Sequence, residues 1–290
     1  MTPIEWLLEP LQYAFMARAL VVTLVAAVTC AILSCWLVQI GWSLMGDAVS
    51  HAVLPGVALS YILGLPFAVG AFVFGAGAVA LIGGVRATTK IKSDAAIGVV
   101  FTALFAMGLV LISITPSQTD LSHILFGNVL GVSDAEIAQV VVIGAVASAV
   151  LLLKRRDLTL FAFDRSHANA IGINTRWLSV LLLGLLALTV VVALQAVGII
   201  LVVAMLITPG ATAYLLTKRF DRMIALAVLV TAVASLGGAY ASFYLDVSTG
   251  GAVVLAQSAA FTLAYLFGLR GGVVTARVRV ARARRLEAAS

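Results

Sequence analysis

The chain has 290 residues, of which 63% are hydrophobic and only 10% are charged, with a formal net charge of +6. Soluble domains average about 45–50% apolar and about 25% charged residues, so this composition excludes an ordinary soluble protein and indicates an integral membrane protein. The basic residues alternate with apolar segments and do not form one patch, which argues against nucleic acid as a partner.

Apolar segments of about 20 residues recur along the chain and predict an all-α, polytopic helical bundle. The first segment is too long for a removable signal peptide, and residues 1–13 before it are expected outside the cell. Residues 14–269 form one transmembrane domain, and a basic cytoplasmic tail follows at 270–290. We predict nine spans, at about 14–40, 44–62, 67–85, 95–115, 137–153, 177–194, 199–216, 224–245 and 252–269.

One part of this assignment leaves an alternative. The run 178–216 has no charged break, and only residues 195–198 separate two spans, so eight spans is the alternative.

Cys30 and Cys35 lie five positions apart in the first span, which puts them on different sides of a helix. We interpret both as buried thiols without a disulfide or a zinc site.

The basic residues predict the orientation, because Lys and Arg gather on the cytoplasmic side. Nine spans place the C-terminus inside, the N-terminus outside, and every basic cluster on the cytoplasmic face. The clusters are Arg86 with Lys90 and Lys92; Lys154, Arg155, Arg156, Arg165 and Arg176; Lys218, Arg219 and Arg222; and the arginines from Arg270 to Arg285.

Asp47 and His51 stand in the second span, four residues apart, within the sequence GDAVSHAVLPG at 46–56. Positions i and i+4 share one helix face, so a carboxylate and an imidazole would project together. Ionisable groups in a bilayer cost about 2.5–3.5 kcal/mol each on insertion scales and usually mark an ion path. Oxygen and nitrogen donors suit a divalent transition metal. The pair is the candidate metal site.

Two spans contain proline and glycine together. Pro55 and Gly56 interrupt the helix that carries Asp47, either as a broken helix beside a transport site or as an ordinary kink. Pro209 and Gly210 interrupt a later span, where small residues allow a neighbouring helix to approach closely.

The loop at about 154–176 contains a predicted short helix. Asp164 can cap its start, and Gly172 stands where a left-handed residue would end it. Such a helix either docks on a partner or lies along the lipid headgroups.

Motifs for catalysis are absent from the sequence. It has no phosphate-binding loop ending in Gly-Lys-Ser or Gly-Lys-Thr, no HExxH pattern and no nucleophile elbow, so we expect no enzyme activity and ATP hydrolysis on a separate chain. His123 is interpreted as exposed outer-loop polarity, and His167 as a residue that forms a hydrogen bond or contacts a partner, not as a metal ligand. Since Asp47 and His51 supply two ligands where zinc takes four, a second copy across a two-fold axis would complete the set.

These segments together resemble the membrane permeases of bacterial ABC importers for manganese, zinc and related metals. The resemblance covers nearly the whole chain and rests on GDAVSHAVLPG at 46–56, DAAIG at 94–98, FGNVLG at 126–131 and LVVAMLITPGATA at 201–213. It implies a multi-pass protein of the bacterial plasma membrane. It also implies a permease homodimer or close heterodimer, two cytoplasmic ATPase subunits, and an extracellular or periplasmic metal-binding receptor.

The resemblance also implies residue roles. Asp47 and His51 match positions that contact the metal in transit, and no cofactor is held permanently. The segment 164–172 matches the coupling helix that inserts into the ATPase, which assigns this role to Asp164, Arg165, Ala168, Ile171 and Gly172.

Rival functions are a secondary-active metal carrier, an ABC permease for a metal chelate, and a membrane scaffold. The carrier would need further acidic groups for ion coupling, and a chelate would not require an Asp and His pair. Manganese, zinc and ferrous iron all accept these two ligands, so the sequence leaves the metal open.

Overall fold

The computed structural model describes residues 8–114, 131–268, 272, 273 and 275. Every regular element in this part of the chain is helical, and nine helical segments are long and apolar enough to cross a membrane. Both the fold class and the count of nine spans are confirmed. The spans are α2 (Ala14–Ile40), α3 (Ser43–Ala52) with α4 (Leu54–Leu63), α5 (Phe67–Thr88), α6 (Ser93–Ile114), α8 (Asp134–Leu153), α11 (Thr175–Val197), α12 (Ile199–Leu216), α13 (Phe220–Leu245) and α14 (Thr249–Phe267).

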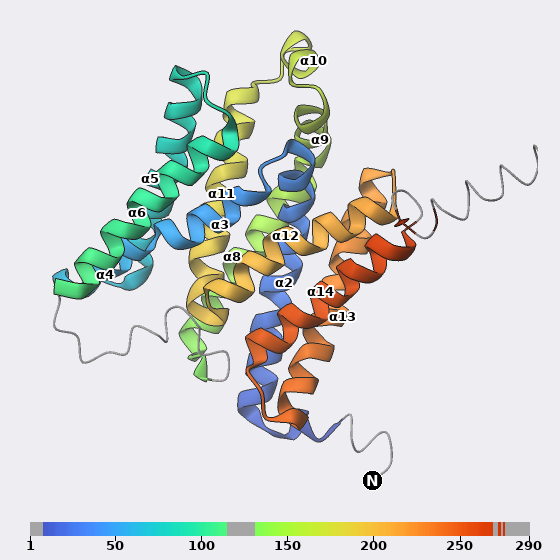
Figure 1. The fold of residues 1–290 in the computed structure, drawn as a ribbon. Helices are drawn as coiled ribbons and strands as arrows, with labels where there is room; N and C mark the ends of the chain where they lie inside the picture. Colours follow the sequence, from blue (N-terminus) through green and yellow to red (C-terminus); the bar gives the residue numbers. More distant parts are fainter. Residues whose placement is uncertain (1–7, 115–130, 269–271, 274, 276–290) are drawn as a thin grey trace, which may run out of the picture.

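The first span lies at the centre of the bundle. Helix α2 packs against α8, α11, α12 and α13, while α4, α5 and α6 form a group on one side and α13 and α14 a group on the other (Figure 1). Cys30 and Cys35 are buried in α2 and are free thiols, as the sequence predicts. The central helices carry the buried core, whereas α6 and α14 bury little of their surface.

Gly198 decides between eight and nine spans. Its φ of 82° ends α11 at Val197, and α12 begins at the next residue. A positive φ is accessible to glycine because it has no Cβ, so one residue suffices for the turn that separates the two spans.

The second span is broken at a different residue from the one expected. The sequence predicts an interruption at Pro55 and Gly56, but α3 ends at Ala52, Val53 forms a turn, and Pro55 lies in the first turn of α4. Proline fits the first turn of a helix because the backbone N–H that it lacks has no intrahelical partner there. The proline starts a helix, and the break precedes it.

Several spans begin earlier than predicted, and at three of them a capping side chain lies upstream of the apolar run. Ser133 and Glu136 form a capping box before α8, with reciprocal bonds between side chain and backbone. The side chain of Asn174 accepts a hydrogen bond from the backbone N–H of Trp177 at the start of α11, and Ser248 caps α14. Each cap satisfies backbone N–H groups that have no carbonyl partner within the helix.

The described basic clusters lie at one end of the bundle, where α5, α8 and α12 end and where α9 (Arg155–Phe163) and α10 (Arg165–Ala170) project (Figure 1). Arg18 lies at the other end and pairs with Asp134 at 3.2 Å. His123 and most of the residues at 1–13 and 270–290 are outside the described part of the chain, although η1 (Pro10–Gln12) precedes α2.

Candidate functional site

Helix α3 brings Asp47 and His51 together. The Nε2 atom of His51 lies 3.4 Å from Oδ1 of Asp47, with one helical turn between the two residues. The side chains are 25% exposed for His51 and 35% exposed for Asp47, so both are partly enclosed yet reachable. The pairing predicted from the i and i+4 spacing is present.

Two phenylalanines of α6 hold the imidazole. The ring of His51 lies 5.4 Å from that of Phe101 and 5.3 Å from that of Phe105, the second contact being edge to face. Among the described residues, nothing hydrogen-bonds the buried Nδ1 atom of His51. The aromatic contacts therefore restrict the ring and leave Nε2 as the nitrogen that faces Asp47. Phe101 and Phe105 were missed in the sequence, although their i and i+4 spacing places them on one helix face.

The separation of the two donor atoms fits one bound cation. Zinc binds carboxylate oxygen and imidazole nitrogen at about 2.1 Å, and two such donors at a tetrahedral angle lie about 3.4 Å apart. No third histidine, cysteine or acidic residue joins the pair among the described residues. One copy of the described chain therefore supplies two ligands, and a cation here would keep water or take ligands from elsewhere.

Close packing fixes the position of α3. A Cβ atom on Gly46 would stand 2.8 Å from Cδ1 of Leu206 on α12, so only glycine allows this approach without a shift. The hydroxyl of Ser50 donates to the carbonyl of Gly46 at 2.8 Å, which satisfies a buried polar group within the helix. Helix α3 also contacts α2, α4, α5, α6 and α11. The candidate site thus lies on a helix that packs against six others.

Helices α4 and α5 cross where two glycines meet. A Cβ atom on Gly56 would overlap the carbonyl oxygen of Gly70, and one on Gly70 would overlap the carbonyl oxygen of Gly56. The hydroxyl of Ser60 accepts a hydrogen bond from the backbone N–H of Gly70 at 3.1 Å. Small residues at a helix crossing let the backbones come into contact, which is a common source of helix association in membranes.

Pro209 does not interrupt its span as the sequence predicts: α12 continues through it, and a side chain from α2 bonds to the backbone on either side of the proline. The hydroxyl of Ser34 on α2 accepts a hydrogen bond from the backbone N–H of Gly210 at 3.0 Å and donates to the carbonyl of Ile207 at 3.4 Å. Neighbouring Ser or Thr side chains commonly satisfy backbone groups near a proline in membrane helices. No pattern in the sequence distinguishes Ser34 from other small polar residues.

The predicted short helix is present as α10. The carboxylate of Asp164 accepts a hydrogen bond from the backbone N–H of His167 at 2.9 Å, and Gly172 has a φ of 87° just after the helix. Ala168 is buried, whereas Arg165 and Ile171 are exposed. The sequence missed α9, which precedes α10 and carries three charged residues in its first turn. An amphipathic helix outside the membrane is not visible to a search for long apolar runs.

A chain of ring contacts connects α10 with the start of α3. The guanidinium of Arg165 lies 5.2 Å from the ring centroid of Phe161, and the Phe161 ring lies 6.5 Å from that of Trp42, edge to face. Trp42 directly precedes α3, and the guanidinium of Arg86 lies over the Trp42 ring, 5.0 Å from its centroid. The helix that carries Asp47 and His51 is thereby joined by side-chain contacts to α9 and α10.

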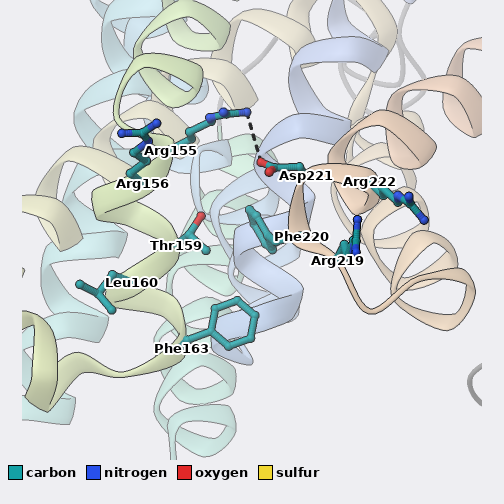
Figure 2. Close-up of a pocket in the computed structure, with 9 residues that line it drawn as sticks. All are labelled: Arg155, Arg156, Thr159, Leu160, Phe163, Arg219, Phe220, Asp221 and Arg222. Atoms are coloured by element: carbon teal, nitrogen blue, oxygen red, sulfur yellow. Dashed lines mark hydrogen bonds and ion pairs between the residues drawn. The ribbon is translucent and has the colours of Figure 1, made fainter.

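A basic cavity of about 780 Å³ separates α9 from the start of α13. Arg155 reaches across it to Asp221, with 3.2 Å between Nη1 and Oδ1, and Phe163 packs edge to face on Phe220 at 6.2 Å (Figure 2). Both charged side chains are largely exposed, so the pair contributes little stability. Phe220 also contacts the buried Trp36 of α2, which anchors this end of the bundle.

Comparison with known proteins places this arrangement among transporters. Residues 12–268 match the model of the ABC 3 transport family. The chain is 50% identical over 270 residues to the manganese transport system membrane protein MntB of Synechocystis sp., covering 93% of this chain and 88% of that protein. It is 45% identical over 282 residues to the chelated iron transport system membrane protein YfeC of Yersinia pestis, covering 97% and 96%.

Solved structures show the same fold. The structure of PsaBC from Streptococcus pneumoniae in complex with Fab matches with a TM-score of 0.83 and 40% identity, covering 92% of this chain and 97% of that one. An inward-facing structure described as a metal-chelate type ABC transporter matches with a TM-score of 0.71 at 18% identity, which shows a shared fold only.

Proposed function

Because the chain belongs to the ABC 3 transport family, we propose that it is the membrane permease of an ATP-driven importer for a divalent transition metal ion. Relatives at 50% and 45% identity over most of their length are named for manganese and for chelated iron transport. The metal is cargo here, and the pair Asp47 and His51 is the proposed point of contact.

The observation that carries this proposal is the 3.4 Å separation of Asp47 and His51 on the enclosed helix α3, which ends in a break just after His51. A carboxylate and an imidazole at that distance can both bind one ion. Two protein ligands bind more weakly than a closed set of four, which suits a site that must release its ion. We propose that a second permease copy, or a closely related one, brings a second pair to the same path across a two-fold axis.

The basic end of the bundle is proposed to face the cytoplasm, with the C-terminus on the same side. Helix α10 would then contact a cytoplasmic ATPase subunit, one for each permease copy, and a metal-binding receptor would deliver the ion at the opposite end. Contacts from Arg165 through Phe161 to Trp42 provide a route by which a movement of α10 reaches α3. ATP binding and hydrolysis would switch the bundle between outward and inward states.

Two other transport functions fit the site less well. A secondary-active carrier would need further ionisable groups near the path, and the described residues hold no group of three or more candidate ligands. A chelate permease needs a wide path, whereas Phe101 and Phe105 crowd His51. We therefore propose a free or hydrated ion as the cargo.

Metal uptake by cells tests the proposal. The chain, co-expressed with its ATPase and receptor, should import radioactive manganese or zinc, and Asp47→Ala or His51→Ala should reduce uptake by more than about tenfold. The matched control is Asp134→Asn, which also removes a carboxylate but at the far end of the bundle. Undiminished uptake in the alanine variants, at equal membrane levels, would rule out the proposed contact. Comparing the two ions identifies the preferred cargo.

A further inference from the structure

A second cavity, of about 620 Å³, lies between α5 and α11 and is separate from the cavity in Figure 2. Its size is within the range of about 300–1,000 Å³ that is usual for small-molecule sites. Its two walls are apolar stretches of membrane-spanning helices, including Ala76 and Ala80 on α5 and Val180 on α11. From Ala76 to Arg86 the α5 wall extends about 15 Å along the membrane-spanning helix.

Three arginines line the end of this cavity at the basic end of the bundle. They are Arg86 at the end of the α5 span, Arg176 at the start of α11, and Arg165 on α10. Arg165 points toward α11, where its Nη2 atom is 3.4 Å from the hydroxyl of Ser179. None of the described residues that line the cavity is acidic, so the three positive charges have no counter-charge within it.

Glycines keep the cavity open. A Cβ atom added to Gly83 on α5 or to Gly184 on α11 would meet no heavy atom within 4 Å. By contrast, a Cβ atom on Gly70 or Gly75, nearer the start of α5, would meet atoms of neighbouring helices. Val180, beside it, is 70% exposed.

We infer that this cavity binds an anionic phospholipid, with the phosphate among Arg86, Arg165 and Arg176 and an acyl chain along the apolar walls. Basic pockets between membrane helices bind anionic lipid headgroups because several fixed positive charges attract the phosphate. The apolar part of the cavity lies at membrane depth, where the ATPase does not reach. A second copy of the chain could occupy this cavity only if it placed acidic groups against the three arginines and also filled the apolar groove.

The site connects to the ring contacts described above. Arg86 stacks on Trp42, and Arg165 stacks on Phe161. The two guanidinium groups that would bind the lipid phosphate therefore also contact the two rings that connect α10 with α3. A bound anionic lipid would neutralise the repulsion among the three arginines and stabilise this arrangement. The inference concerns the membrane-embedded chain and does not depend on which ion is transported.

Native mass spectrometry of the purified full-length chain tests the site with phosphatidylglycerol and phosphatidylcholine as probes. Each surface arginine strengthens anionic lipid binding by roughly fivefold, so replacing all three should weaken phosphatidylglycerol binding by about 100-fold. The test variant is Arg86→Gln with Arg165→Gln and Arg176→Gln. Its control is Arg156→Gln with Arg219→Gln and Arg222→Gln, which removes equal charge from the cavity in Figure 2.

A second pair of variants keeps every charge. Gly184→Leu should fill the groove and displace the acyl chain, whereas Gly237→Leu, on α13 with equally open space, should leave phosphatidylglycerol bound. The inference is supported if the test variant and Gly184→Leu lose phosphatidylglycerol while both controls retain it. The inference is overturned if both triple variants lose phosphatidylglycerol equally, or if inorganic phosphate displaces the lipid. It is also overturned if Gly184→Leu lowers the fraction of dimer without changing lipid binding.

Discussion

The hydroxyl of Ser34 accepts a hydrogen bond at 3.0 Å from the backbone N–H of Gly210, although the two residues are 176 positions apart. The contact joins α2 to α12 at the residue after Pro209, where the helix has lost one of its own hydrogen bonds. It lies in the buried centre of the bundle, so both the polar pairing and the absence of a Cβ atom on Gly210 have energetic consequences.

Gly210→Ala is expected to destabilise the protein by about 1–3 kcal/mol, because its Cβ atom would stand 2.5 Å from the hydroxyl oxygen of Ser34. Ser34→Ala should cost a similar ~1–3 kcal/mol by leaving a buried N–H unsatisfied. Thermal unfolding in detergent, followed by tryptophan fluorescence, measures both. Gly184→Ala, which adds a Cβ atom in open space, is the control. Equal unfolding temperatures for Gly210→Ala and this control would show that α2 and α12 do not need the close approach.

Exchanging the two candidate ligands tests whether metal uptake requires a carboxylate and an imidazole one turn apart on α3. The double variant Asp47→His with His51→Asp keeps a carboxylate and an imidazole one turn apart on α3, so it should retain more metal uptake than Asp47→Ala or His51→Ala. Uptake of radioactive manganese and zinc at matched membrane levels is the measurement. If the exchanged pair supports no more uptake than the single alanine variants, the two positions are not equivalent ligands of one ion. The contacts of Phe101 and Phe105 with His51 would then make the histidine necessary at its own position.

Asp164 is expected to control the stability of α10. Removing its capping carboxylate with Asp164→Ala should cost about 0.5–2 kcal/mol of local helix stability, because the backbone N–H of His167 loses its acceptor. Asparagine caps helices about as well as aspartate, so Asp164→Asn should behave like the wild type. Hydrogen exchange at 165–170 reports the helix, and co-purification of the ATPase reports docking. Faster hydrogen exchange with unchanged ATPase binding would show that α10 is not part of the surface that docks on the ATPase.

Trp42 is expected to couple ATP hydrolysis to transport. Trp42→Ala removes the ring that lies between Arg86 and Phe161, and with it the contact from α9 to the start of α3. Coupling energies of about 0.5–2 kcal/mol predict that the number of ions moved per ATP falls about 2- to 30-fold while hydrolysis continues. Trp42→Phe keeps an aromatic surface and should fall less. Parallel loss of hydrolysis and transport would instead indicate that Trp42 supports the assembly as a whole.

Local features of the sequence were predictable. The nine spans follow from runs of apolar residues, the pairing of Asp47 with His51 from the pitch of a helix, and the start of α10 from the capping preference of aspartate. Each of these depends on residues fewer than about 30 positions apart. Errors occurred where a cap lay upstream of the apolar run, as at Asn174, and where a helix was too polar to be noticed, as at α9.

Only the tertiary structure decided which distant residues meet. Ser34 bonds to Gly210, and Phe101 and Phe105 contact His51. Three arginines from α5, α10 and α11 line one cavity. All three arrangements arise because helices far apart in sequence pack side by side. In a membrane the apolar surfaces of all spans are nearly equivalent, so hydrophobicity alone does not select their neighbours. Close glycine contacts and a few polar bonds make that selection, and the sequence by itself does not show their partners.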